Sequence, residues 1–181
     1  MRRTDKFLPR QGDSWTWSLA RTEDDINDIV LMAKQFYESE VGDIFSTDPA
    51  ILRKNVELAI TEQKYTLNQQ QIIISRSKSD QKLLAWAWID RKHYTPYASE
   101  EMADARFAHI DLSLSARDRV TLCAQIIQQW ILWCNIHTIP VLISSSIRAE
   151  QNAFLRLHEQ FGFKRNGSVC YYRVENYFKE N

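Results

Sequence analysis

Two titratable side chains, His109 and Asp111, occupy alternate positions in the segment Phe107–Leu114. Apolar and polar residues alternate in this segment, which predicts a β-strand with one buried face. Residues two apart in a strand lie on the same face, with their Cβ atoms about 7 Å from each other. A histidine and a carboxylate in this arrangement could take a proton from a nucleophile, directly or through water. A polar strand face on which His109 is only hydrogen-bonded explains the same pattern.

A third titratable side chain, His158, lies in a predicted helix that runs from about Ala149 to Phe161. Helical periodicity places it on one face with Phe154, Leu157 and Phe161. Histidine changes its charge near neutral pH, so this residue could transfer a proton. A single histidine on an apolar helix face is also compatible with a buried residue of the core, and both interpretations stay open.

These residues belong to a run of strand, helix, strand and helix. Ser115 follows the first strand and can cap a helix, with Asp118 three residues later as a variant of the capping box. Pro140 opens the second strand, Val141–Ile147, which is mostly apolar and β-branched. A strand–helix–strand unit of this length has parallel strands and a right-handed connection.

The rest of the chain supplies further elements of both kinds. Asp48 and Pro49 predict a helix start, with Asp as N-cap and Pro at the first helical position. The polar segment 91–106 is predicted as a long loop, and such loops are often functional. The other predicted elements are the helix Asp24–Glu38 and the strands Trp15–Leu19, Gln71–Arg76, Leu83–Asp90 and Gly167–Glu175. The second and third of these strands flank a short polar turn and are expected to pair as a hairpin.

The order of these elements and the closing run LHEQFGF at 157–163 resemble the core of the GCN5-related N-acetyltransferases (GNAT). The closing run is similar to the LHEKLGF variant of phosphinothricin-type acetyltransferases. In the family, a Q/R-x-x-G-x-G/A loop after the first core strand holds the pyrophosphate of acetyl-coenzyme A (acetyl-CoA). The matching stretch is Arg119–Ala124, with Leu114 at the apolar position before it and Leu122 where the motif has its first glycine.

The resemblance implies an α/β (α+β) fold, with a mixed central sheet of about six to seven strands flanked by about four helices. Residues 15–181 would form one acyl-CoA N-acyltransferase domain behind an N-terminal arm of residues 1–14. The activity implied is transfer of an acetyl group from acetyl-CoA to an amine. His109 or Asp111 would be the general base, and His158, where the family usually has Tyr, would protonate the departing thiolate.

The resemblance also implies a set of residues that bind the cofactor: Leu114, Arg117, Arg119, Val120, Thr121, Leu122, Cys123 and Ala124. Pyrophosphate is bound by backbone N–H groups at a helix N-terminus, which glycine allows to approach closely. Here Leu122 would present its isobutyl group toward the phosphate, and Asp118 adds a negative charge. Alternatively, Ser115 and Asp118 satisfy the helix end themselves and leave no anion site.

Composition argues against several other classes of protein. The formal net charge is +0, so no global field favours nucleic acid or an acidic membrane. No stretch approaches about 20 uninterrupted apolar residues, and the first residues lack the apolar core of a signal peptide. The three cysteines are odd in number and lack metal-ligand spacing. We therefore expect a protein of the cytoplasm, or of an assembly formed there, with reduced thiols and no metal site.

Two functions of different classes are compatible with these features. The first is an N-acetyltransferase whose acceptor, an amine of a small molecule or a protein, attacks the thioester directly. The second is a catalytically inactive GNAT-fold protein that serves as a structural or interaction component of a larger assembly, such as a viral particle. The second rests on the missing glycine, on Asp118, and on the polar residues 1–14, which could contact a neighbouring chain.

Overall fold

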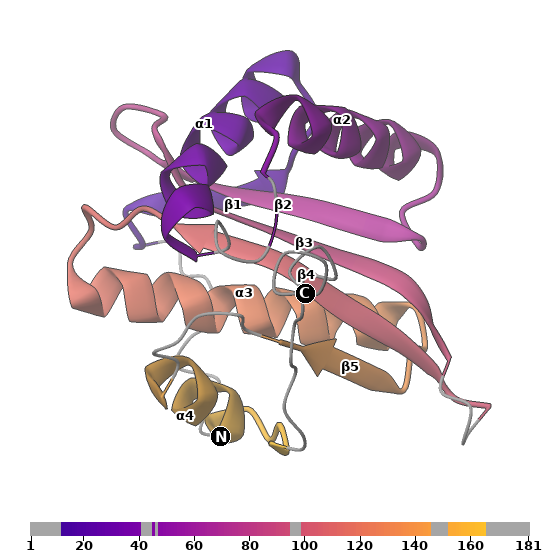
Figure 1. Ribbon diagram of the computed structural model, residues 1–181. Coiled ribbons are helices and arrows are strands. Elements are labelled where there is room, and N and C mark those ends of the chain that lie inside the picture. Colours follow the sequence, from indigo (N-terminus) through magenta and orange to yellow (C-terminus); the bar gives the residue numbers. More distant parts are fainter. Residues whose placement is uncertain (1–11, 41–44, 46, 95–98, 146–151, 166–181) are drawn as a thin grey trace, which may run out of the picture.

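A mixed five-stranded sheet organises the part of the chain that the computed structural model describes, residues 12–40, 45, 47–94, 99–145 and 152–165 (Figure 1). The strands follow one another in sequence order across the sheet. They are β1 (Trp15–Leu19), β2 (Gln70–Ser77), β3 (Leu83–Tyr94), β4 (Glu101–Ile110) and β5 (Val141–Ser144). Neighbours from β1 to β4 are antiparallel, whereas β5 is parallel to β4. The parallel pair and the β2–β3 hairpin confirm the sequence predictions, and the predicted strand Gly167–Glu175 lies outside the described residues.

Helices cover both faces of the sheet (Figure 1). On one face lie α1 (Glu23–Glu40) and α2 (Pro49–Tyr65), and on the other lie α3 (Ala116–Ile136) and α4 (Asn152–Gln160). Each face has its own apolar core. The α1–α2 side buries, among others, Ile29, Phe36, Val56, Ile60, Ile72, Ile74 and Trp86. The α3–α4 side buries Ile73, Ala85, Ile89, Leu122, Ile126, Trp130 and Leu157 among others.

Local signals set the helix starts where the sequence predicts them. The Asp48 side chain accepts a hydrogen bond of 2.8 Å from the Ala50 amide, and Pro49 is the first residue of α2. At α3 the Ser115 hydroxyl oxygen accepts from the Asp118 amide at 3.2 Å. The same hydroxyl donates to the Asp118 carboxylate at 2.7 Å, which completes the predicted variant of the capping box.

The prediction of a loop at 91–106 is wrong for most of that segment. β3 continues to Tyr94 and β4 begins at Glu101, so both ends of the segment belong to a long hairpin. The buried face of β4 is made of small residues, Ala103 and Ala105, which are 0% and 4% exposed. Alanine has a low β propensity, so the alternation of buried alanines with polar residues in β4 gives only a weak strand signal in the sequence. An ion pair between Arg91 of β3 and Glu101 of β4 further stabilises this hairpin.

The predicted strand Phe107–Leu114 is wrong at both ends. β4 starts earlier, at Glu101, and ends at Ile110. Asp111 then turns the chain, because its carboxylate accepts from the Ser113 amide at 2.9 Å and its carbonyl accepts from the Leu114 amide at 3.3 Å. No helix of the described part of the chain combines the length and apolar character that a membrane span requires.

Candidate active site

The parallel strands β4 and β5 pair over only part of β4. Their register runs from Met102 opposite Val141 to Ala105 opposite Ser144, where β5 ends. β4 continues to Ile110 and stays paired with β3. Within the described residues, β4 beyond Ala105 thus has no partner in β5.

A β-bulge coincides with the end of this pairing. Phe107 lies opposite Trp88 while Ala105 lies opposite Ile89, so Arg106 is an extra residue in β4. Its guanidinium lies over the Trp88 ring at 5.0 Å from the centroid and forms an ion pair with Asp90 at 3.0 Å. A bulge of this kind bends the strand and redirects the side chains that follow it.

His109 lies near the end of β4 on the α1–α2 side of the sheet. It is buried, and its ring stacks on Phe36 with 4.5 Å between the ring centroids. The rings of Trp86 and Phe107 contact the imidazole edge-on, with 5.2 and 6.3 Å between the ring centroids. The imidazole is therefore held in one orientation by aromatic side chains from α1, β3 and β4.

Asp111 is also buried, but it is engaged on both oxygens. One oxygen accepts from the Ser113 amide, and the other forms an ion pair with Lys82 at 2.5 Å. Burial alone would raise the pKa of Asp111, but hydrogen bonds from Lys82 and Ser113 outweigh it and hold the pKa below the ordinary value. The two candidate bases thus differ in environment, since His109 lies among aromatic rings and Asp111 lies in a charged turn.

The N-terminus of α3 follows that turn. Ser115 satisfies two of the first amides of the helix, since its hydroxyl accepts from Asp118 and its carbonyl accepts from Arg119 at 3.0 Å. A helix leaves its first N–H groups without partners inside the helix. The amides of Ala116 and Arg117 are therefore the ones that a bound anion could use, together with the positive end of the helix dipole.

The stretch Arg119–Ala124, matched to the phosphate loop, lies inside α3 rather than in a loop. Leu122 and Ala124 are both fully buried in the core on the α3–α4 side. The expectation that Leu122 presents its isobutyl group toward a phosphate is therefore wrong. Of the other matched residues, Val120 is exposed, Cys123 is half-buried, and the Thr121 hydroxyl donates to the Arg117 carbonyl at 2.9 Å.

Two further residues of the predicted cofactor site precede this stretch. Leu114 is half-buried and packs against the core, and the Arg117 side chain is exposed at the helix start.

His158 lies on α4, buried, with both ring nitrogens in contact with polar atoms. Nδ1 lies 2.9 Å from the Phe154 carbonyl oxygen, and Nε2 lies 3.0 Å from the Ser144 hydroxyl at the end of β5. Burial lowers the pKa of His158, and the hydrogen bond to Phe154 opposes this effect only in part. Sequence reasoning missed Ser144. The predicted strand Val141–Ile147 placed Ser144 in its interior, whereas β5 ends at this residue, and ligands of open α/β sheets bind at the carboxyl ends of strands.

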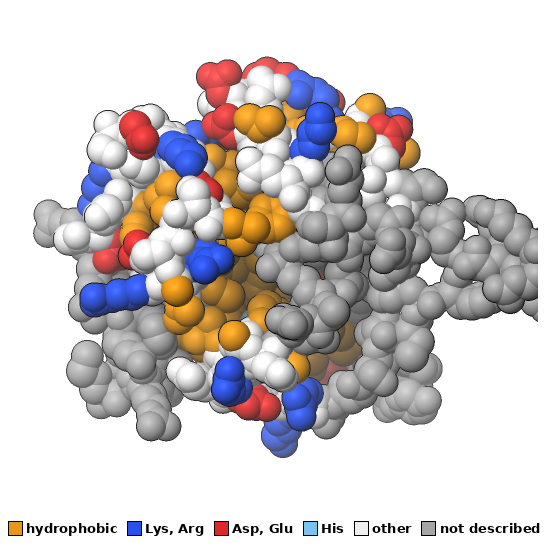
Figure 2. Space-filling view, turned by 60° about the vertical axis from the view of Figure 1, so that its left-hand side comes forward, with side chains coloured by type: hydrophobic (Ala, Val, Ile, Leu, Met, Phe, Trp, Pro, Cys, Tyr) orange, Lys and Arg blue, Asp and Glu red, His pale blue; other side chains and the backbone are white. Residues whose placement is uncertain are grey.

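Figure 2 shows the side of the molecule on which α3 begins. Hydrophobic side chains gather there in a hollow, and Lys and Arg side chains stand around it. Exposed apolar residues from this part of the chain include Phe107 of β4, Leu112 of the following turn and Val120 of α3. An apolar hollow with basic residues around it suits a ligand that is partly apolar and carries negative charge.

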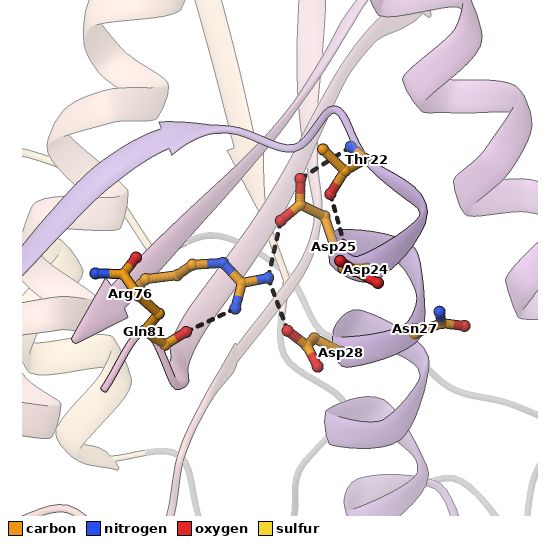
Figure 3. A pocket seen from close by; sticks show the side chains of 7 residues that line it. All are labelled: Thr22, Asp24, Asp25, Asn27, Asp28, Arg76 and Gln81. Carbon is orange, nitrogen blue, oxygen red and sulfur yellow. Dashed lines mark hydrogen bonds and ion pairs between the residues drawn. The ribbon is translucent and has the colours of Figure 1, made fainter. Parts of the chain in front are cut away.

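A cavity of about 460 Å³ lies apart from this hollow, at the N-terminus of α1 (Figure 3). Two of its acidic side chains pair with Arg76, which contacts Asp25 at 2.8 Å and Asp28 at 2.7 Å and donates to the Gln81 carbonyl at 2.8 Å. Burial opposes the ionisation of Asp25, yet hydrogen bonds from Arg21, Arg76 and Thr22 lower its pKa. The network links α1 to β2, which is a structural role. Within the described chain, no cluster of three or more His, Cys, Asp or Glu side chains could hold a metal ion.

Comparison with known proteins finds likeness in structure only. No protein-family model matches the chain, and no curated protein sequence matches it. The structure is similar to aminoglycoside 6'-N-acetyltransferase AAC(6')-Ih from Acinetobacter baumannii, with a TM-score of 0.63 at 12% identity over 88% of this chain and 97% of that one. It is also similar to AAC(6')-Iy solved in complex with CoA, with a TM-score of 0.65 at 15% identity over 92% of this chain and 98% of that one.

A third similar structure is a possible acetyltransferase from Clostridium difficile 630. Its TM-score is 0.62 at 12% identity, over 89% of this chain and 97% of that one. At such identities the likeness establishes the fold.

Proposed function

Because the chain has the fold of the GCN5-related N-acetyltransferases, we propose that it transfers an acetyl group from acetyl-CoA to an amine by direct attack on the thioester. The acceptor is an amine of a small molecule or of a protein. Two of the similar structures support this proposal, because AAC(6')-Iy was solved both with CoA and with a bisubstrate analogue.

The observation that carries the proposal is that the pairing of β4 with β5 ends well before β4 does, close to the start of α3. The pairing with β5 ends at Ala105 and Ser144, and the chain then leads from β4 through a short turn into the helix. The amides of Ala116 and Arg117, with the Arg117 side chain, would hold a pyrophosphate there. When bound, acetyl-CoA supplies an activated acyl group.

The geometry favours His109 over Asp111 as the general base. An amine must lose its proton to act as a nucleophile, and a useful base has a pKa near the working pH. The lowered pKa of Asp111 makes it a weak base, and both of its oxygens are already engaged. Asp111 instead fixes the turn between β4 and α3. The role of His158 as general acid remains a prediction. Burial lowers its pKa, which favours accepting a proton over donating one.

Calorimetric titration with CoA tests the proposal, and the variant Ala116→Pro tests whether the first amide of α3 contacts the phosphate. Proline at the first helical position removes one N–H group but is well tolerated there, as Pro49 of α2 illustrates. We expect micromolar binding by the natural chain. Since hydrogen bonds to charged groups contribute about 1.5–3 kcal/mol, the variant should bind about 10- to 100-fold more weakly at unchanged melting temperature. Equal affinity of the two proteins would place the phosphate elsewhere.

A second function, a structural component without catalysis, is favoured by one observation. The Ser115 hydroxyl and the Asp118 carboxylate bond to each other at the start of α3, so the helix end carries its own negative group. A carboxylate there competes with a bound phosphate. Absence of any heat at millimolar CoA would reject the enzyme and support this second function.

A further inference from the structure

Ser144 has no role in acetyl transfer by direct attack, yet it forms a hydrogen-bonded pair with His158. The hydroxyl of Ser144, the last residue of β5, lies 3.0 Å from Nε2 of His158 on α4. Ser144 is half-buried, whereas His158 is only 4% exposed. The rings of Phe154 and Phe163 flank the imidazole at 4.0 and 4.9 Å between ring centroids. The serine is thus the accessible member of the pair, and the histidine is shielded behind it.

The partners of His158 determine which way its hydrogen bonds run. The Phe154 carbonyl oxygen can only accept, so Nδ1 carries the proton and donates to it. Burial favours the neutral imidazole, in which Nε2 then bears a lone pair. The Ser144 hydroxyl therefore donates to Nε2. The serine is bonded to a base whose tautomer is fixed by a third group.

A nucleophile within reach of a base, with the base oriented by a third group, is the arrangement that activates serine for acyl transfer. In this chain a backbone carbonyl takes the place of the orienting carboxylate. We propose that Ser144 is a nucleophile that accepts acyl groups from activated esters, which gives the protein a hydrolase activity that requires no amine. The substrate class is acyl esters and thioesters with a good leaving group.

The position of Ser144 in the sheet supports this role. It lies opposite Ala105, at the point where the pairing of β4 and β5 ends. An acyl carbonyl bound beside the part of β4 that follows Ala105 would lie next to Ser144, the last residue of β5. The preceding residue, Ile143, is exposed, so the end of β5 is open to solvent on one side.

The reaction balances with water as the only further reactant. Ser144 Oγ attacks the acyl carbon while its proton moves to Nε2 of His158, and the bond to the leaving oxygen or sulfur breaks. The leaving group takes that proton and departs as an alcohol or thiol. Water then attacks the acyl-serine ester, giving one proton to Nε2, and the carboxylic acid is released as Ser144 recovers its proton from His158.

The test uses p-nitrophenyl acetate, which contains no nucleotide and so does not depend on a CoA site. We expect release of p-nitrophenol and an acetyl group on the peptide that contains Ser144, detected by mass spectrometry after acid quenching. Ser144→Ala should lower the rate by about 100-fold or more, in keeping with the contribution of an assisted nucleophile. Ser145→Ala, an exposed serine one residue further on, is the matched control and should retain the full rate.

His158→Phe keeps a ring in the buried site, removes the base, and should lower the rate as much as Ser144→Ala does. If this variant does not fold, the conservative Ser144→Ala variant alone decides. Hydrolysis that is equal in the natural chain and Ser144→Ala, or acetylation confined to other residues, would overturn the proposal. Because the ester lacks CoA, a failure of CoA binding leaves this outcome unaffected.

Discussion

Gln125 of α3 joins the first strand of the sheet to the helix that covers it. Its side-chain oxygen accepts from the indole N–H groups of both Trp15 and Trp17, at 2.8 and 2.7 Å. Its amide nitrogen donates to the Asp13 carboxylate at 3.0 Å. Gln125 is only 1% exposed, so water cannot readily replace it as a partner. We predict that Gln125→Leu strongly destabilises the fold, although leucine fills nearly the same volume.

The magnitude follows from the bonds that are lost. A neutral hydrogen bond contributes about 1 kcal/mol, and one to a charged group about 1.5–3 kcal/mol. The added apolar surface of leucine offsets part of this loss, which leaves about 2–4 kcal/mol in the free energy of unfolding. For a chain of 150–250 residues, each kcal/mol shifts the melting temperature by about 2–4 °C, so we expect a decrease of about 4–16 °C.

Thermal and urea unfolding of Gln125→Leu and Gln128→Leu provide the measurement and its matched control. Gln128 lies on the same helix, and its side-chain oxygen is buried without a hydrogen-bond partner among the described residues. The same substitution there removes no bond of that oxygen and should be close to neutral. If the two variants lose equal stability, the reasoning about the indole bonds is refuted.

Three further predictions concern single buried groups. The pKa of Asp111 is lower in the folded protein than its unfolded value of about 3.9, so its charge stabilises the fold above that pH. This contribution disappears as the pH falls through the folded pKa, so the free energy of unfolding of Asp111→Asn should decrease less with acid than that of the natural chain. Parallel curves of unfolding free energy against pH would contradict this. Burial raises the pKa of Cys134 to about 11, so alkylation at pH 8 should label it only after unfolding, and rapid native labelling would contradict that. Leu122→Ala should cost about 2–5 kcal/mol in unfolding free energy without improving CoA affinity, and tighter binding would return Leu122 to the phosphate site.

Elements with local signals were predictable from the sequence. Asp48 and Pro49 define the start of α2, and the Ser115–Asp118 pair defines the start of α3, because a cap depends on residues only a few positions apart. The parallel order of β4 and β5 also followed from one strand–helix–strand unit.

Features that depend on tertiary contacts were not predictable. The long β3–β4 hairpin is held by strand pairing and by contacts such as that between Arg106 and Asp90, which leave little trace in local periodicity. The Ser144–His158 bond joins the end of a strand to a helix further along the chain. Residue types alone could single out His158, but only the packing of α4 against β5 reveals its partner.

The exact start of α3 changes the meaning of the missing glycine. Glycine is needed where the backbone itself approaches a phosphate, and under the proposed function that place would be the first turn at Ala116 and Arg117. Leu122 lies beyond that turn, with its side chain in the core, so its bulk does not count against anion binding. The motif match therefore points to α3, and the proposed phosphate site lies one turn or more before the matched residues. The argument for an inactive scaffold then depends on residues 1–14 and on Asp118, and Asp118→Asn should strengthen CoA binding if its charge is the obstacle.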